Sequence, residues 1–361
     1  MIQKRVIYCL AIIGLIGINA CSNDDIQTID PPAIGAIIDP EVGGSNQPNQ
    51  VFIDLSGDSQ TSVPRNAWDL GFYTGTDFRV VLNNSASTLA RSIDKDDLNA
   101  VTAEDTIGFG AQLNIDAIFG ALFGPPTTWL SSAASWSDDP SGDLSKTAIA
   151  EVSATAKDNR VYIVNRGKNP DSSARGWMKI RVLRSSNGYT LQYAEINATS
   201  FQELSITKNN AYDFIPVSFD NGMISSFPEK NEWDLVFTVF TDLLQVDANI
   251  SIPYAIRDYV LINANSVEVA AVEITSEVTY EDFAIGSIGS LDFSSEVAAI
   301  GSGWRNVAQP NSNLETGVKE DVFYIIKDTA GNYYKLGFTR LVDAQTGERG
   351  NPQFQYDLLV Q

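Results

Sequence analysis

Apolar and polar positions alternate along most of the chain in the pattern of β-strands. Runs of about five to eight residues are rich in β-branched and aromatic side chains. In the run 178–183 (MKIRVL), for example, apolar residues alternate with charged ones, and a turn signal, Asn187-Gly188, follows. We therefore predict an all-β protein, β-rich with few short helices, built from packed or curled antiparallel sheets.

Helical signal is confined to a few places. Residues 94–103 and 114–123 have the composition of short helices, and Gly124, Pro125 and Pro126 would end the second.

A set of short segments occurs twice in the same order. The first copy holds 51–56 (VFIDLS), 67–74 (AWDLGFYT), 161–165 (VYIVN), 178–183 (MKIRVL) and 189–196 (YTLQYAEI). The second copy holds 214–219 (FIPVSF), 232–238 (EWDLVFT), 323–327 (FYIIK), 334–341 (YKLGFTRL) and 354–359 (FQYDLL). A repeat of this kind indicates two tandem domains of similar fold, at residues 48–205 and 206–361.

The first residues have the layout of a secretory signal. Basic residues precede an apolar run at 6–18, and a cysteine follows at position 21. The segment 15–21 resembles the lipobox of bacterial lipoproteins. We therefore predict that residues 1–20 are a signal peptide and that Cys21 carries a lipid.

The next segment, 21–47, is rich in Asp, Asn, Pro and Gly and predicts a flexible tether. Its run 22–25 (SNDD) resembles the surface-export signal of Bacteroidetes lipoproteins. No later stretch reaches the roughly 20 apolar residues that a spanning helix needs. We expect a protein of the outer membrane or cell surface that is held there only by its lipid.

Composition excludes several kinds of partner and chemistry. The chain has 45 acidic and 24 basic residues, a formal charge of -21, which would repel nucleic acid. Removal of Cys9 and acylation of Cys21 would leave no thiol for a disulfide or a metal. There is no histidine, no GxSxG turn, no P-loop and no GxGxxG turn that opens a helix. We expect neither an enzyme nor a metal site.

The repeated segments resemble the HmuY family of Bacteroidetes lipoproteins, whose members share an early strand, a Trp-Asp-Leu or Trp-Asp-Met strand and a closing antiparallel pair. The second copy matches over most of residues 210–361, and the first copy matches more loosely. The segments that carry the match are 214–222, 233–237, 303–304, 322–334 and 353–360.

This resemblance implies a surface haem-binding lipoprotein, mostly β, in which two axial histidines hold haem between loops. Aligned through Gly303-Trp304, one ligand position falls on about Gln309 and the other within 272–283. Neither offers an imidazole, because the sequence contains no histidine. Methionine can replace histidine on haem iron, but Met178 and Met223 lie in strands outside these positions.

Several aromatic residues are candidates for ligand contact, each with a structural alternative. Trp304 and Gln309 are candidates through the family alignment, and Trp129 and Trp136 through an aromatic-rich stretch at 109–136 that would be either a ligand-gripping loop or a packed helix. Residues that would either line a site or complete the core are Trp68, Asp69, Trp233 and Asp234. Tyrosines that would either bind ferric iron or satisfy the sheet are Tyr324, Tyr333, Tyr334 and Tyr356.

Two functional hypotheses follow. The first is an exported surface lipoprotein that binds haem, or a related small ligand, without the axial histidines. The alternative is a non-haem tandem β adhesion or accessory module that binds protein or glycan through an exposed aromatic patch near Trp129 or Trp136.

Overall fold

The computed structural model describes residues 31–309 and 313–360, and almost all of its regular structure is antiparallel β-sheet. The β-rich class with few short helices is therefore confirmed. Four sheets and one two-stranded ribbon, β16 (Arg305–Asn306) with β17 (Gly317–Val318), make up the fold.

Two of the sheets form what we call the split lobe, because its strands come from both ends of the chain. The five-stranded sheet has the order β1 (Gly35–Ile38), β20 (Arg349–Leu358), β19 (Tyr333–Val342), β18 (Val322–Lys327) and β15 (Glu268–Glu273). The four-stranded sheet has the order β14 (Ser251–Ile262), β13 (Leu235–Gln245), β2 (Asn49–Asp54) and β3 (Ser59–Pro64).

The other two sheets form the continuous lobe, whose strands follow one another from residue 70 to residue 223. The five-stranded sheet has the order β10 (Gln202–Thr207), β9 (Gly188–Glu195), β8 (Trp177–Ser185), β7 (Val161–Asn165) and β6 (Leu89–Ile93). The four-stranded sheet has the order β12 (Gly222–Met223), β11 (Phe214–Ser218), β4 (Leu70–Tyr73) and β5 (Val80–Leu82).

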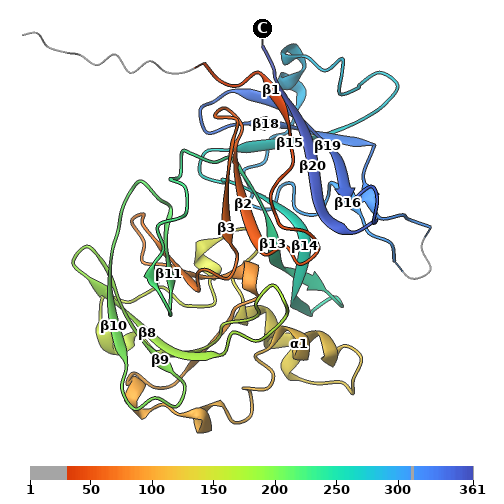
Figure 1. Cartoon of the computed structure of the whole chain (residues 1–361). Helices are drawn as coiled ribbons and strands as arrows, with labels where there is room; N and C mark the ends of the chain where they lie inside the picture. Colours follow the sequence, from red (N-terminus) through yellow and green to blue (C-terminus); the bar gives the residue numbers. More distant parts are fainter. Residues whose placement is uncertain (1–30, 310–312, 361) are drawn as a thin grey trace, which may run out of the picture. The chain divides into compact units, whose positions relative to one another are not determined.

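The early strand of each sequence repeat pairs with the Trp-Asp-Leu strand of the other repeat. β2 pairs with β13, with Ile53 opposite Leu235, and β11 pairs with β4, with Val217 opposite Leu70. Figure 1 shows the orange β2 beside the teal β13, although they are far apart in sequence. The sheets consequently do not divide between residues 205 and 206, where the sequence places the domain boundary, because backbone hydrogen bonds cross it.

Each lobe has its own apolar core. In the split lobe, Phe237, Phe338 and Phe354 pack among aliphatic side chains of both sheets. In the continuous lobe, Phe72 and Tyr189 pack among aliphatic side chains of its two sheets. Their rings meet edge to face, with centroids 5.1 Å apart.

Helical structure is limited to short elements. The helix expected at 114–123 is confirmed as α1 (Ile115–Ala121), whose first turn is capped by the side chain of Asn114. At 94–103 there is no α-helix, because the chain makes two separate 3₁₀ turns, η2 (Leu98–Ala100) and η3 (Ala103–Thr106). The remaining 3₁₀ elements are η1 (Asn84–Ala86), η4 (Trp129–Trp136), η5 (Leu144–Lys146), η6 (Ala156–Asp158) and η7 (Ile285–Ser290).

Candidate functional site

The two Trp-Asp-Leu segments place their aspartates at equivalent structural positions. Both Asp69 and Asp234 are fully buried. Asp69 accepts a hydrogen bond of 2.9 Å from the Phe219 N–H just after β11, and Asp234 accepts one of 2.8 Å from the Leu55 N–H just after β2. Each carboxylate thus fastens the end of the exchanged strand, which is the structural role that the sequence allowed.

The two positions differ in charge. Asp69 forms ion pairs with Arg166 at 2.9 Å and Arg175 at 2.8 Å. Asp234 accepts from the Thr329 N–H instead, and no Lys or Arg of the described residues pairs with it. Burial, and the nearby charge of Asp328, raise the pKa of Asp234 to about 7.

The two tryptophans stand half-buried at the edge of an aromatic network. Trp68 meets Phe227 with ring centroids 5.9 Å apart, Phe227 meets Phe52 at 5.3 Å, and Phe52 meets Trp233 at 5.2 Å. All three contacts are edge to face, so several ring faces remain for a ligand.

These rings line a cavity of about 320 Å³, which we call the aromatic cleft. Its walls come from both lobes and from the segment 138–147. The side chains that define it are Phe52, Trp68, Tyr73, Phe214, Phe227, Trp233, Val236, Phe240 and Leu261, with Gln50, Asn84, Thr238, Asp138, Asp139 and Asp143 as polar members. A largely apolar cavity with a few polar groups is the usual form of a small-molecule site.

The polar members of the cleft include three acids, and its amides and hydroxyls, among them Gln50, Asn84 and Thr238, can both donate and accept. Asp138 is buried and accepts from the Leu82 N–H at 2.6 Å and the Ala148 N–H at 2.9 Å, and burial raises its pKa to about 7. The Oδ1 atom of Asn84 is buried without a hydrogen-bond partner in the described structure. Such an atom is rare in folded proteins.

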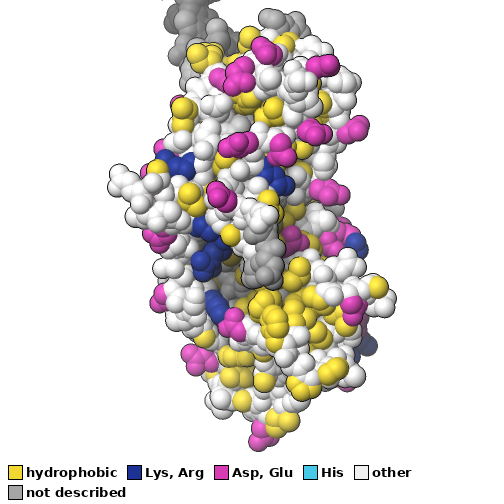
Figure 2. All heavy atoms as spheres, turned by 90° about the vertical axis from the view of Figure 1, so that its right-hand side faces the viewer, with side chains coloured by type: hydrophobic (Ala, Val, Ile, Leu, Met, Phe, Trp, Pro, Cys, Tyr) yellow, Lys and Arg dark blue, Asp and Glu magenta, His cyan; other side chains and the backbone are white. Residues whose placement is uncertain are grey.

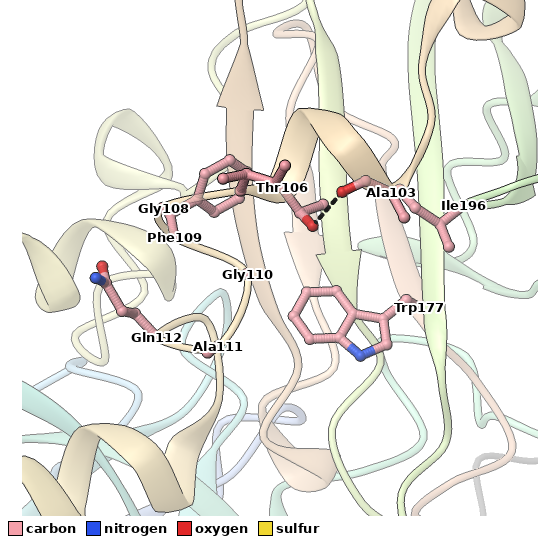
Figure 3. A pocket seen from close by; sticks show the side chains of 10 residues that line it. Ala103, Thr106, Gly108, Phe109, Gly110, Ala111, Gln112, Trp177 and Ile196 are labelled. Atoms are coloured by element: carbon pink, nitrogen blue, oxygen red, sulfur yellow. Dashed lines mark hydrogen bonds between the residues drawn. The ribbon is translucent and has the colours of Figure 1, made fainter.

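A second cavity, of about 570 Å³, lies under the loop 103–112 beside Trp177 of β8. Figure 3 shows Phe109, Trp177 and Ile196 around it, with Thr106 donating to the carbonyl of Ala103 at 2.7 Å. No charged side chain lines it.

Figure 2 views the molecule from the side on which α1 lies in Figure 1, and apolar side chains gather over the lower part of that face.

The residues suggested by the family alignment do not form a site together. Trp304 is fully buried, stacks on Phe338 with centroids 4.2 Å apart and donates from Nε1 to the carbonyl of Asp258. It is therefore a core residue and not a ligand contact. Gln309 is exposed in the segment after β16, and the aromatic cleft does not include it.

Trp129 and Trp136 pack against each other, with ring centroids 5.9 Å apart and planes 13° from parallel. Trp136 is buried and Trp129 is half-buried in a core cluster that also contains Ile118 of α1. Residues 129–136 are thus a packed element, whereas Phe123 of the same aromatic-rich stretch is 78% exposed.

Three of the four candidate tyrosines, Tyr324, Tyr334 and Tyr356, belong to the split-lobe core, whereas Tyr333 is half-buried beside Phe293. The Tyr356 hydroxyl donates to Asp58 at 2.8 Å, and the Tyr334 hydroxyl donates to the carbonyl of Ala33 at 3.2 Å. Burial raises the pKa of Tyr324 to about 12 and raises the pKa of the other two further. A phenolate ligand for iron is correspondingly disfavoured.

The two methionines lie in strands, as the sequence predicts, and not at the family's ligand positions. Met178 is buried in the continuous lobe, whereas Met223 is exposed on β12.

Cys21, the predicted lipidation site, lies outside the described residues. Within the described ranges there is no cluster of three or more acidic, cysteine or histidine residues that could hold a metal ion, and no helix long and apolar enough to cross a membrane.

Comparison with known families now identifies the group to which the chain is related. The model of the HmuY protein family matches residues 46–356. The chain belongs to the HmuY family. The match runs across both lobes, so every wall of the aromatic cleft lies inside the HmuY region. No curated protein and no solved structure matches the chain.

Part of this site is predictable from the sequence. The repeated motif singles out Trp68 and Trp233 as residues that would line a pocket or fill the core. Phe52 and Phe227, which connect the two tryptophans, could not be singled out. Phe52 is one apolar residue among several in a strand, and Phe227 lies in a segment without periodicity.

Proposed function

We propose that this protein is an exported, lipid-anchored binding protein of the HmuY family that takes a flat ligand of the tetrapyrrole class into the aromatic cleft. The observation that carries the proposal is the network Trp68–Phe227–Phe52–Trp233, which joins the two repeats around one cavity. The role is binding rather than catalysis.

The residues present do not fit the ligation of haem iron by histidine, since the sequence has none. The two methionines of the described chain lie apart, and the core tyrosines are held in their neutral form. Binding would therefore depend on contacts with the ring, and the affinity should not depend on the metal.

The test is an absorbance titration of the protein with haem and with iron-free protoporphyrin. We expect both to bind with affinities within about threefold of each other, because dispersion and stacking act on the ring. Trp233→Leu should weaken the binding of both rings by about tenfold, because it removes one aromatic contact and the apolar area that this contact buries.

Trp177→Leu is the matched control, because it removes a tryptophan from the second cavity and leaves the cleft intact. Equal losses in the two variants, or no saturable binding of either ring, would contradict the proposal. In the latter case the protein or glycan hypothesis would be the one to pursue, by capture of partners from cells.

The anchor is tested separately at Cys21. We expect Cys21→Ser to abolish the incorporation of labelled fatty acid and to release the protein from the membrane fraction. Lipid on Cys21 would account for a membrane link in a strongly acidic protein, which has little attraction for anionic lipid heads. Continued labelling of the variant would exclude this anchor.

A further inference from the structure

The charge of the aromatic cleft is unusual for a site that takes a tetrapyrrole. Asp138, Asp139 and Asp143 line it, and no Lys or Arg is among its lining residues in the described chain. Haem carries two propionates, which would enter this cleft without a cationic partner and beside like charges. A carboxylate placed near others in this way loses stability by Coulomb repulsion.

Among the described residues, Lys146 is the cation that pairs with these acids, and it does not make the charge of the cleft positive. Lys146 lies 3.1 Å from Asp143 and 3.8 Å from Asp139, so a single positive charge is shared by two carboxylates. Its side chain is mostly exposed, where solvent screens it. Asp138 lies deeper, and its acceptor atoms are used by backbone N–H groups.

The other groups of the cleft favour the same kind of ligand. Faces of tryptophan attract cations when the charge lies within about 6 Å of the ring, and Trp68 and Trp233 are both partly exposed and line the cleft. The ring faces and the acids of the cleft are thus matched by positive charge, and not by an anion.

We infer that the aromatic cleft selects a flat ring ligand that bears positive charge over an anionic ring such as haem. This inference rests on the proposed function, because it requires that a ring ligand enters the cleft. It deepens that function by stating the charge of the ligand.

The test compares two iron-free porphyrins of similar size, the cationic tetra(N-methylpyridinium)porphyrin and the anionic tetra(sulfonatophenyl)porphyrin, with the full chain at physiological ionic strength. We expect the cationic ring to bind at least about tenfold more tightly. The double variant Asp139→Asn, Asp143→Asn should reduce this preference about tenfold. Asparagine can still accept the N–H bonds of Ser141 and Ser145 that these aspartates now accept.

The net charge of the protein would attract a cationic ring to any part of the surface, so a second double variant is the control. Asp96→Asn with Glu277→Gln removes the same charge from exposed positions outside the cleft and should leave both affinities within about twofold. An equal loss in the two double variants would overturn the inference.

The outcomes separate the inference from the function on which it rests. Equal or tighter binding of the anionic ring, weakened by Trp233→Leu, would overturn the charge preference and leave the cleft as the binding site. Binding of neither ring would remove both. A cationic preference that the cleft variant abolishes and the control retains would support the inference.

Discussion

The ion pair between Asp69 and Arg166 should contribute strongly to stability, and Arg166→Met tests this. Arg166 forms a bidentate contact with Asp69, from Nε at 2.9 Å and from an Nη at 3.0 Å, and the aspartate is fully buried. Removing one partner of a buried pair costs about 3–5 kcal/mol, because the remaining charge is left without its partner. Arg175 still contacts Asp69 at 2.8 Å, so we expect the lower end, about 3 kcal/mol.

The assay is urea unfolding followed by tryptophan fluorescence, with Arg160→Met as the matched control. Arg160 pairs at 3.3 Å with Asp94, whose side chain is 92% exposed. That surface pair should contribute less than about 1 kcal/mol. A loss in Arg166→Met no larger than in the control would refute the reasoning, since Arg175 and the backbone N–H would then suffice to hold the carboxylate.

Two further predictions concern the split-lobe core and the response to pH. Trp304→Ala should lower the free energy of unfolding by about 3–5 kcal/mol, because it opens a cavity against Phe338; an unchanged stability, with loss of ligand binding alone, would restore Trp304 as a ligand contact. Burial raises the pKa of Asp138 and Asp234 to about 7, so the folded state keeps protons that the unfolded state releases near pH 4. The stabilisation is complete below the unfolded pKa and is lost as pH rises through 7, so unfolding should require less urea at pH 8 than at pH 5. In Asp138→Asn this difference should shrink, and an undiminished difference would mean that other groups cause it.

The β-class could be predicted from sequence, whereas the pairing of each early strand with a distant Trp-Asp-Leu strand could not. The segments 51–56 and 214–219 are both short, apolar and rich in branched residues, so either can pair with either Trp-Asp-Leu strand. Only the surrounding packing decides, and Asp69 and Asp234 then fix the choice by binding the N–H groups that follow the exchanged strands. A repeat in sequence therefore fixes the order of strands along the chain but not the sheet in which each one lies.

The aromatic cleft, like the fold, could be predicted only in part from the sequence. Trp68 and Trp233 belong to a repeated motif and could be singled out, but their cleft depends on contacts between segments far apart in sequence. The alignment to the family through Gly303-Trp304 instead drew attention to Trp304, whose size and Nε1 donor are used by the core. A buried tryptophan with a satisfied donor and one at the rim of a cavity look the same in a sequence.

The carboxylates of the two Trp-Asp-Leu segments are held in different ways, and this difference affects stability. Arg166 follows β7 and Asp328 follows β18, at matching positions of the two copies. The carboxylate of the continuous lobe is thus neutralised by an arginine, whereas that of the split lobe faces another buried acid. In an Asp138→Asn background, which removes the buried acid of the continuous lobe whose pKa is also raised to about 7, alkaline conditions should therefore weaken the split lobe first, because Asp234 must ionise there without a cation. If amide hydrogen exchange at pH 8 instead opened β4 and β11 before β2 and β13, the ion pairs of Asp69 would not be what distinguishes the lobes.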